Sequence, residues 1–340
     1  AQCLESSGHA CGLIGTMGIG RLEGLIDLDM TTPNPVSLQA KLAEFCHQKI
    51  SYVVIEASSH ALDQGRLNSV GVDVAVLTNL SREHLDYHKD MAAYREAKKR
   101  LFDFDSVKTA VINMDDEFGQ SLIDSLTNRK GLTLITYSSQ LKNMTLLAKH
   151  VKASLKGLKF TIANKAEAGQ IECDVVGHFN IDNLLAAAGG LLAIQVPFNT
   201  VLNLINKCHD IDGRMQMLGN EDQTSVVIDF AHTPDALEKT LKSLKLLMHK
   251  DGQLWCVFGC GGERDLGKRP LMGSKAEQHA DQIVLTTDNS RSESNKTIVA
   301  EISKGIKSQD KVHVEHDRKK AITYAINNAK NEDIVLIAGK

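Results

Sequence analysis

Three side chains that can bind a metal lie within a five-residue span of the stretch "TNLSREHLDYHKD", residues 78–90. His84, Asp86 and His88 would share one face of a strand, whereas on a helix only His84 and His88 would, one turn apart. Zinc hydrolases use such clusters and keep one coordination position open for water. The same spacing suits a polar loop whose histidines only form hydrogen bonds, so both interpretations stay open at this point.

A carboxylate and a histidine follow another apolar run, "SYVVI". Glu56 and His60 stand where that run ends, in "EASSH". A carboxylate in this place suits Mg²⁺, which takes few protein ligands and keeps waters and phosphates. His84 can join such a site, although imidazole is an unusual magnesium ligand. The stretch "GTMGIG", residues 15–20, lacks the Lys-Ser/Thr ending of a phosphate loop, and we predict a turn there.

Two arginines follow later apolar runs. "FGCGGERD" is a glycine-rich turn that can bring backbone amides against an anion, and it contains Arg264. Arg291 follows the next run, in "TTDNSR". Both guanidinium groups can hold a carboxylate with two hydrogen bonds. The alternative is a tight turn with surface arginines.

The composition limits the class of protein. The chain has 340 residues, 42% of them hydrophobic and 24% charged, with a net charge of -3. These values are ordinary for a globular protein and predict no nucleic-acid partner. No apolar run reaches the ~20 residues of a membrane span, and the first residues do not form a signal peptide. Seven scattered cysteines favour a reducing cytoplasm.

The order of elements predicts an α/β fold with two open, mostly parallel sheets. Short apolar runs that suit buried strands alternate with amphipathic helical patterns, which is typical of βαβ units. Residues 131–176 contain little helical pattern and predict an antiparallel insertion, and 180–194 predict a helix. A second alternating series begins near residues 209–215, with Thr233 as the N-cap of a helix. The polar clusters stand at strand ends, where sites lie in such folds. The predicted runs are 51–56, 72–79, 90–102 (helix), 108–116 and 225–232.

Eight motifs occur in the order seen in the Mur ligases, which this chain resembles over essentially its whole length. They are "EASSHALDQGR", "TNLSREHLDYH", "YREAKK", "GHFNIDNLLAA", "GRMQML", "DFAHTPDALEK", "FGCGGERDLGKRPLMG" and "DNSRSE". The resemblance is strongest to the branch that uses ATP to add the third residue of the peptidoglycan stem peptide. It implies that residues 1–212 are a central ATP-binding domain without its first strand and phosphate loop. Residues 213–340 would be a Rossmann-like C-terminal domain that stops before its end.

The resemblance implies an ATP-dependent amide ligase of cell-wall synthesis, linked to cell shape and division. It would add meso-diaminopimelate to UDP-N-acetylmuramoyl-L-alanyl-D-glutamate through an acyl phosphate. Glu56 and His84 match the family's Mg²⁺ positions. Lys98 matches the lysine that is carbamylated and can then hold Mg²⁺ as a carboxylate does. In that case the metal holds phosphate, and Asp86 and His88 are structural.

The remaining site residues also come from the resemblance. The expected contacts to the UDP-sugar peptide are Thr31, Thr32, Ser58, Gln64 and Arg66, with Met30 where the family often has asparagine. The expected ATP contacts are Asn180, Asn183, Arg214 and Asp229. The expected contacts to the incoming amino acid are Arg264, Asp288, Asn289 and Arg291.

One departure concerns amino-acid specificity. The family's Asp-Asn-Pro-Arg motif is "DNSR" here, with Ser290 in place of proline. Losing the proline frees the φ angle of the turn, so Arg291 is less constrained. Because lysine lacks the distal carboxylate that Arg291 would bind, we still expect diaminopimelate to be preferred.

Several alternatives remain. They are an L-lysine-adding ligase, a folylpolyglutamate synthase, a zinc hydrolase using His84, Asp86 and His88, and an inactive fragment that binds substrate only. "DNSRSE" and "GERDLGKRP" argue against the synthase. We expect a cytoplasmic monomer whose partners are small-molecule substrates.

Overall fold

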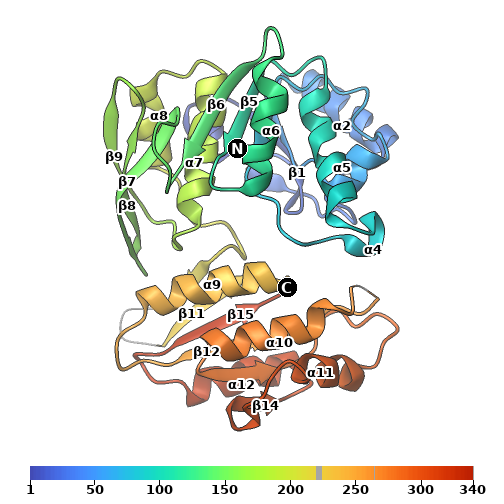
Figure 1. The fold of residues 1–340 in the computed structure, drawn as a ribbon, viewed down its shortest axis with the longest axis vertical. Coiled ribbons are helices and arrows are strands. Elements are labelled where there is room, and N and C mark those ends of the chain that lie inside the picture. Colours follow the sequence, from blue (N-terminus) through green and yellow to red (C-terminus); the bar gives the residue numbers. More distant parts are fainter. Residues whose placement is uncertain (220–223, 264, 340) are drawn as a thin grey trace.

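The computed structural model of the chain describes residues 1–219, 224–263 and 265–339. Figure 1 shows two layered α/β bodies joined end to end. We call residues 1–212 the N-terminal half and residues 213–339 the C-terminal half. Most strand pairs in both halves are parallel, which confirms the predicted fold class.

The N-terminal half begins with a three-stranded sheet in the order β2-β1-β3. Its strands are β1 (Cys11–Gly15), β2 (Gly18–Gly20) and β3 (Tyr52–Ile55), and β1 is parallel to β3. The turn predicted for 15–20 is confirmed at residues 16 and 17, which connect β1 to β2, whereas residues 18–20 form β2 itself. Helix α2 (Pro35–His47) makes the crossover to β3 and buries Leu38 and Phe45 against this sheet. Short helical segments around it are α1 (Gln2–Ser6), η1 (Leu22–Gly24) and α3 (Ser59–Asp63).

The second sheet has the order β4-β5-β6-β7-β8-β9. Its strands are β4 (Val74–Leu77), β5 (Thr109–Asn113), β6 (Thr133–Ser138), β7 (Leu146–Ser154), β8 (Gly157–Ala163) and β9 (Ala168–Cys173). Strands β7 to β9 form the predicted antiparallel part. The prediction was wrong for β6, which is parallel to β5. Helix α6 (Glu117–Thr127) crosses over between them, and such a crossover returns the chain in the same direction.

Strands β3 and β4 lie in different sheets, although their alternation with helices suggested a single one. Among the described residues, β3 pairs only with β1 and β4 only with β5. Each strand therefore keeps one unpaired edge, and Val54 and Val76 are 37% and 38% exposed there. The two sheets share a packing layer, because Leu101 and Phe104 contact the apolar cores of both.

Helices complete the N-terminal half. Helix α5 (Met91–Asp103) confirms the helix predicted for 90–102, and Asp90 caps it by accepting from the Ala93 N–H at 2.8 Å. Helix α7 (Asn180–Ala193) confirms the one predicted for 180–194. The others are α4 (Leu85–His88) and α8 (Phe198–Ile205).

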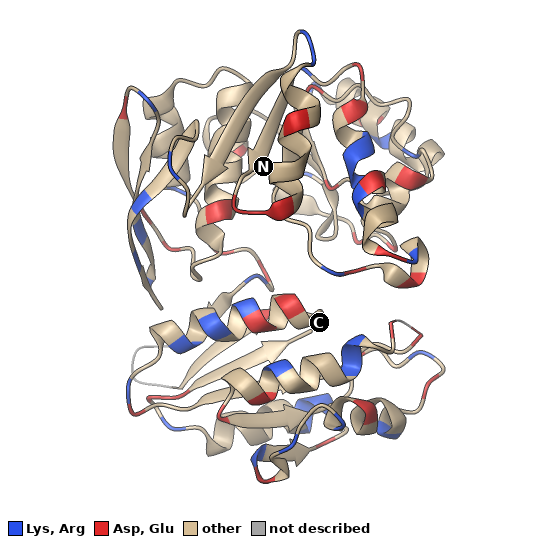
Figure 2. Cartoon of the chain, viewed as in Figure 1, with Lys and Arg blue, Asp and Glu red and all other residues tan. Residues whose placement is uncertain are grey.

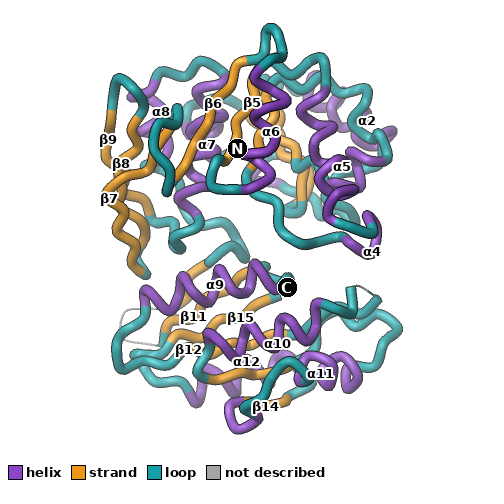
Figure 3. The backbone as a smooth tube through the Cα atoms, in the orientation of Figure 1, coloured by secondary structure: helices purple, strands orange, loops and turns teal. Residues whose placement is uncertain are grey.

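The C-terminal half is one six-stranded sheet in the order β10-β11-β15-β12-β13-β14. Figure 3 shows its helices lying over the sheet. Helices α9, α10 and α11 share one apolar core, and α12 packs against the other. Thr233 caps α9 as predicted, accepting from the Ala236 N–H at 3.2 Å. The strands are β10 (Gln216–Leu218), β11 (Ser225–Asp229), β12 (Leu254–Phe258), β13 (Gln282–Leu285), β14 (Val312–Val314) and β15 (Ile334–Ala338). The helices are α9 (Pro234–Leu247), α10 (Lys268–His279), α11 (Asn295–Ser303), η2 (Gln309–Lys311) and α12 (Arg318–Asn328).

The surface carries interspersed charges of both signs, as Figure 2 shows along α9. No helix within the described residues combines the length and apolar character needed to cross a bilayer.

Two adjacent glycines in α7 test how tightly this helix packs on the second sheet. A Cβ at Gly189 would lie 2.5 Å from Val111 Cγ1 on β5, whereas a Cβ at Gly190 would meet nothing within 4 Å. We expect Gly189→Ala to lower the free energy of unfolding by about 1–3 kcal/mol through overpacking. Gly190→Ala should raise it by up to about 1 kcal/mol, because alanine favours helix. Urea unfolding of both variants measures the difference, and equal effects would contradict the packing described here.

Candidate functional site

The five polar clusters that follow predicted strands do follow strands β3, β4, β11, β12 and β13. Glu56 comes directly after β3, and its N–H donates to the Ile14 carbonyl at 2.8 Å. Thr16 holds this carboxylate: its N–H and its hydroxyl donate to Glu56 Oε2 at 3.1 and 2.6 Å. The other oxygen, Oε1, has no hydrogen bond among the described residues. A Cβ at Gly15 would lie 2.8 Å from Glu56 Cδ, so the turn after β1 needs glycine to approach this side chain.

Lys98 lies on the buried face of α5 beside this carboxylate. Its Nζ donates to the Ala57 carbonyl at 3.1 Å. Burial lowers the pKa of the Lys98 amine, against the opposing charges of Glu83 and Glu56, which raise it. Lys99 points elsewhere and lies 3.8 Å from Asp103 on the same helix. Of the two neighbouring lysines, Lys98 is therefore the one at the site.

His84 stands in the loop between β4 and α4, in the left-handed region with φ of 56°. Burial lowers its pKa, while the nearby charges of Glu83 and Asp86 raise it. Its ring meets the ring of His60 edge-on, with centroids 5.0 Å apart. Glu56, Lys98 and His84 belong to one region, because Lys98 bonds to the residue that follows Glu56, and the His84 ring lies 6.0 Å from that of Tyr94, one turn before Lys98 on α5.

The other two residues of the opening motif do not join a metal cage. His88 is buried and stacks on Tyr94, with ring centroids 5.3 Å apart, while Asp86 is exposed on α4. Over the described ranges, no group of three or more His, Cys, Asp or Glu side chains is placed to hold a metal ion. This arrangement does not favour the zinc-hydrolase alternative.

The five residues expected to contact the UDP-sugar peptide form one hydrogen-bonded network. The Thr32 hydroxyl donates to the Glu56 carbonyl at 2.6 Å and accepts from the Ser58 N–H at 3.1 Å. Arg66 donates to the Thr32 carbonyl at 2.8 Å and to Gln64 Oε1 at 2.6 Å. Thr31 lies at the edge, its hydroxyl 3.3 Å from that of Thr16. Met30 replaces the family's asparagine, and its Sδ is 3.4 Å from Arg66 Nη1.

The four residues expected to contact ATP divide between the halves. Asn183 donates to Asn180 Oδ1 at 2.8 Å within α7. Asp229, at the end of β11, accepts from the Met215 N–H at 2.9 Å, and burial raises its pKa. Arg214 lies over the Phe230 ring, 4.7 Å from its centroid.

The predicted amino-acid pocket is a pair of loops joined by hydrogen bonds. Gly262 donates its N–H to the Asn289 carbonyl at 2.9 Å, and Arg291 Nη1 donates to the Gly262 carbonyl. Arg291 adopts a left-handed conformation with φ of 49°. A Cβ at Gly262 would lie 2.0 Å from the Ser290 carbonyl oxygen, so the loops approach closely only because this residue is glycine. Arg264 lies outside the described residues.

Three further residues lie at the site although the sequence did not single them out. Glu83 accepts a hydrogen bond from His232 Nε2 at 2.9 Å, which joins the two halves. Arg318 lies near Asp288 and donates to the Thr287 and Gly339 carbonyls at 3.1 and 2.7 Å. The motifs "TNLSREH" and "DFAHTP" contain Glu83 and His232, and nothing in either motif indicates that they pair.

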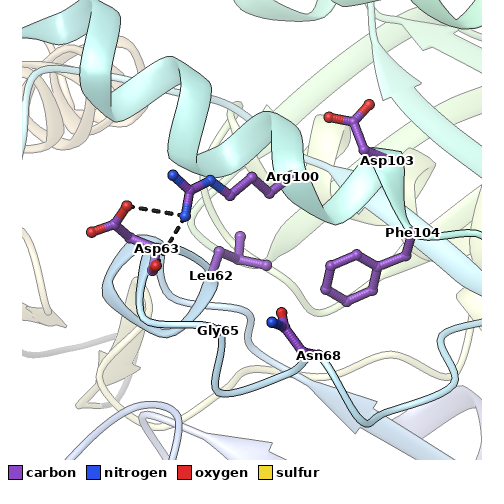
Figure 4. A pocket seen from close by; sticks show the side chains of 7 residues that line it. All are labelled: Leu62, Asp63, Gly65, Asn68, Arg100, Asp103 and Phe104. Carbon is purple, nitrogen blue, oxygen red and sulfur yellow. Dashed lines mark hydrogen bonds and ion pairs between the residues drawn. The ribbon is translucent and has the colours of Figure 1, made fainter.

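A small open pocket lies next to this region, as Figure 4 shows. Arg100 crosses it and pairs with Asp63, with 3.1 Å between Nη1 and Oδ1. None of the predicted site residues lines this pocket. Asp63 also accepts from the Tyr87 hydroxyl at 2.8 Å, and that hydroxyl lies next to Gln64 of the UDP-sugar network. The pocket therefore borders the UDP-sugar network and does not contain it. Its lining residues are Leu62, Asp63, Gly65, Asn68, Arg100, Asp103 and Phe104.

Comparisons with known proteins cover the whole chain. The family model of the Mur ligase middle domain matches residues 1–191, and that of the Mur ligase glutamate ligase domain matches residues 213–340. A UDP-N-acetylmuramoyl-L-alanyl-D-glutamate–2,6-diaminopimelate ligase from Coxiella burnetii is 44% identical, over 100% of this chain and 70% of the relative. One of the same name from Pseudomonas aeruginosa is 42% identical, over 100% and 69%. A solved structure of a ligase of that name is 39% identical with a TM-score of 0.71, over 100% and 69%.

The Thr32 hydroxyl offers a test of the network. Thr32→Val removes its hydrogen bonds and leaves the Ser58 N–H without this acceptor, at a site that is only 1% exposed. We expect the free energy of unfolding to fall by about 1–3 kcal/mol. Thr31→Val is the matched control and should change it by less than about 0.5 kcal/mol. Chemical denaturation of both variants measures this free energy. An unchanged free energy of unfolding in Thr32→Val would show that the network does not stabilise the fold.

Proposed function

This chain belongs to the Mur ligase family of ATP-dependent amide ligases, and on that premise we propose that it joins diaminopimelate to UDP-N-acetylmuramoyl-L-alanyl-D-glutamate. The observation that carries the proposal is the 44% identity over the whole chain to a relative named for that reaction. The product would be a precursor of peptidoglycan, made in the cytoplasm by a monomer.

The proposed reaction has two steps. The D-glutamate carboxylate attacks the γ-phosphate of ATP, which forms an acyl phosphate and releases ADP. The amine of diaminopimelate then attacks the acyl carbon, and phosphate leaves as the amide bond forms. Charge develops on phosphoryl oxygens in the first step, so fixed cations and hydrogen-bond donors supply most of the stabilisation.

Lys98 is proposed to carry a carbamate. Carbamylation requires a neutral amine, which adds to CO₂ and releases one proton. Burial lowers the pKa of Lys98 and so favours that neutral form. The resulting carbamate would place a carboxylate-like group next to Glu56.

The residues present fit a magnesium ion bound with substrate. Glu56 offers the oxygen Oε1, while Thr16 holds the other one. Together with the Lys98 carbamate and His84 it would supply few protein ligands, as Mg²⁺ prefers when phosphates and waters complete its shell. When bound, the ion would neutralise charge on the transferred phosphate.

The substrates are proposed to bind on both sides of this group. The network of Thr31, Thr32, Ser58, Gln64 and Arg66 would bind the UDP-sugar peptide, beside Glu56. The ATP contacts would be Asn180, Asn183, Arg214 and Asp229. The incoming amino acid would meet Asp288, Asn289 and Arg291, with Arg264 as a further candidate.

Replacing each of the two neighbouring lysines by alanine tests the proposed role of Lys98. In the natural gene product that contains these residues, Lys98→Ala should lose most ATP-dependent ligation, and added bicarbonate should not restore it. Lys99→Ala is the matched control and should have a mild effect, because its amine faces Asp103. Product formation by both variants is the measurement. The reverse pattern would assign the carbamate to the wrong lysine, and two mild effects would remove it from the mechanism.

Arg291 tests the proposed amino-acid specificity. A sheltered contact from its guanidinium to the distal carboxylate of diaminopimelate is worth about 1.5–3 kcal/mol, or one to two powers of ten in selectivity over L-lysine. We expect Arg291→Ala to raise KM for diaminopimelate far more than KM for ATP. Ser290→Pro should sharpen the preference or leave it unchanged. Similar kcat/KM values for the two amino acids in the unmodified enzyme would favour the lysine-adding alternative.

A further inference from the structure

A hydrogen bond joins the two halves at a point away from the chain that connects them. His232, which follows β11 in the C-terminal half, donates from Nε2 to Glu83 Oε1 at 2.9 Å. Glu83 stands just before α4, and Figure 1 shows α4 projecting toward the C-terminal half. The contact therefore lies where the loops at the strand ends of both halves meet.

The ring of His232 is held from both sides. Its Nδ1 lies 2.9 Å from the Phe230 carbonyl oxygen, and its Nε2 faces the Glu83 carboxylate. Both partners are acceptors, and the hydrogen bond with Glu83 raises the pKa of His232, against the burial that lowers it. Lys268 places its ammonium group beside this contact by donating to the His232 carbonyl at 2.9 Å. Charge-assisted hydrogen bonds of this kind are about twice as strong as neutral ones.

Glu83 also borders the candidate metal residues. Its second oxygen, Oε2, lies 3.7 Å from His84 Nε2. Its charge acts on the pKa of Lys98 as well. One carboxylate thus bonds to the C-terminal half and adjoins the group of Glu56, His84 and Lys98.

A separate, apolar contact joins the halves on another side. Val176 belongs to the core of the C-terminal half, and Leu155 and Phe179 pack against it. Leu155 stands at the turn between β7 and β8, and in Figure 1 this hairpin and α4 lie on opposite sides of the view. Breaking the contact between Glu83 and His232 would leave the apolar contact in place. The two halves could then rotate apart with the apolar contact as the hinge.

We propose that Glu83 is a positioning residue whose bond to His232 latches the C-terminal half over the Glu56, His84 and Lys98 group. The latch would bring the amine-bearing substrate of one half to the carboxyl-bearing substrate of the other. This consequence for catalysis rests on the proposed function, whereas the latch itself does not.

A distance measurement tests the latch without any assay of activity. Spin labels are attached to Cys46, an exposed thiol of the N-terminal half, and to an introduced Lys250→Cys in the C-terminal half. The 340-residue chain should give one narrow distance distribution. Glu83→Gln and His232→Gln should each broaden it, with about a tenfold or larger shift toward open molecules, as expected for a lost charge-assisted hydrogen bond. Glu117→Gln, at a carboxylate that is 92% exposed and pairs within the N-terminal half, is the matched control.

A double variant separates a latch from two unrelated defects. Glu83→Gln with His232→Gln should open the halves no further than either single change, because both remove the same bond. In the active enzyme the single variants should lower kcat about tenfold with little change in KM for the UDP-sugar peptide or for diaminopimelate, since the proposed contacts to each of these two substrates lie within one half. Distance distributions unchanged in both single variants would overturn the latch. An opened distribution with unchanged kcat would keep the latch and overturn its role in catalysis.

Discussion

The placement of the Lys98 amine beside Glu56 is the constraint on which the candidate site depends. A buried ammonium costs several kcal/mol unless it is paired or neutral. Helix α5 keeps Lys98 in place because Tyr94, Ala97 and Phe102 are buried on the same helix. Leu101 and Phe104 then fasten the helix and its end to the cores of both neighbouring sheets. The carboxylates and the histidine around Lys98 come from the loops after β3 and β4, and Thr16 holds the Glu56 carboxylate there.

Close approach of loops at the strand ends recurs in both halves. Gly15 lets the β1 turn reach the Glu56 carboxylate, and Gly262 lets the loop after β12 reach the Ser290 carbonyl. In each case a Cβ would clash with the group opposite. The loops are therefore held by backbone contact as well as by side chains, which preorganises polar groups at the edge where parallel strands end.

Acidic side chains of the N-terminal half face basic side chains of the C-terminal half where the two halves meet. The N-terminal half contributes Glu56 and Glu83, and the C-terminal half faces Glu83 with the His232 ring, near Lys268. Burial alone would raise the pKa of Glu83, but the hydrogen bond from His232 and the nearby cations lower it to about 2. This ionised carboxylate makes the meeting of the halves a polar contact, in contrast to the apolar packing around Val176.

Local patterns in the amino-acid sequence were enough to predict the α/β class and the main strands and helices of both halves, while the candidate site residues came from the ordered family motifs. Alternating apolar runs and helical patterns carry that information within short segments, as does the cap at Thr233. The same patterns did not indicate that β6 is parallel to β5, that β3 and β4 lie in separate sheets, or that Glu83 meets His232. These three features depend on tertiary packing, because strand pairing and a contact across 149 residues of chain arise from how whole layers fit together.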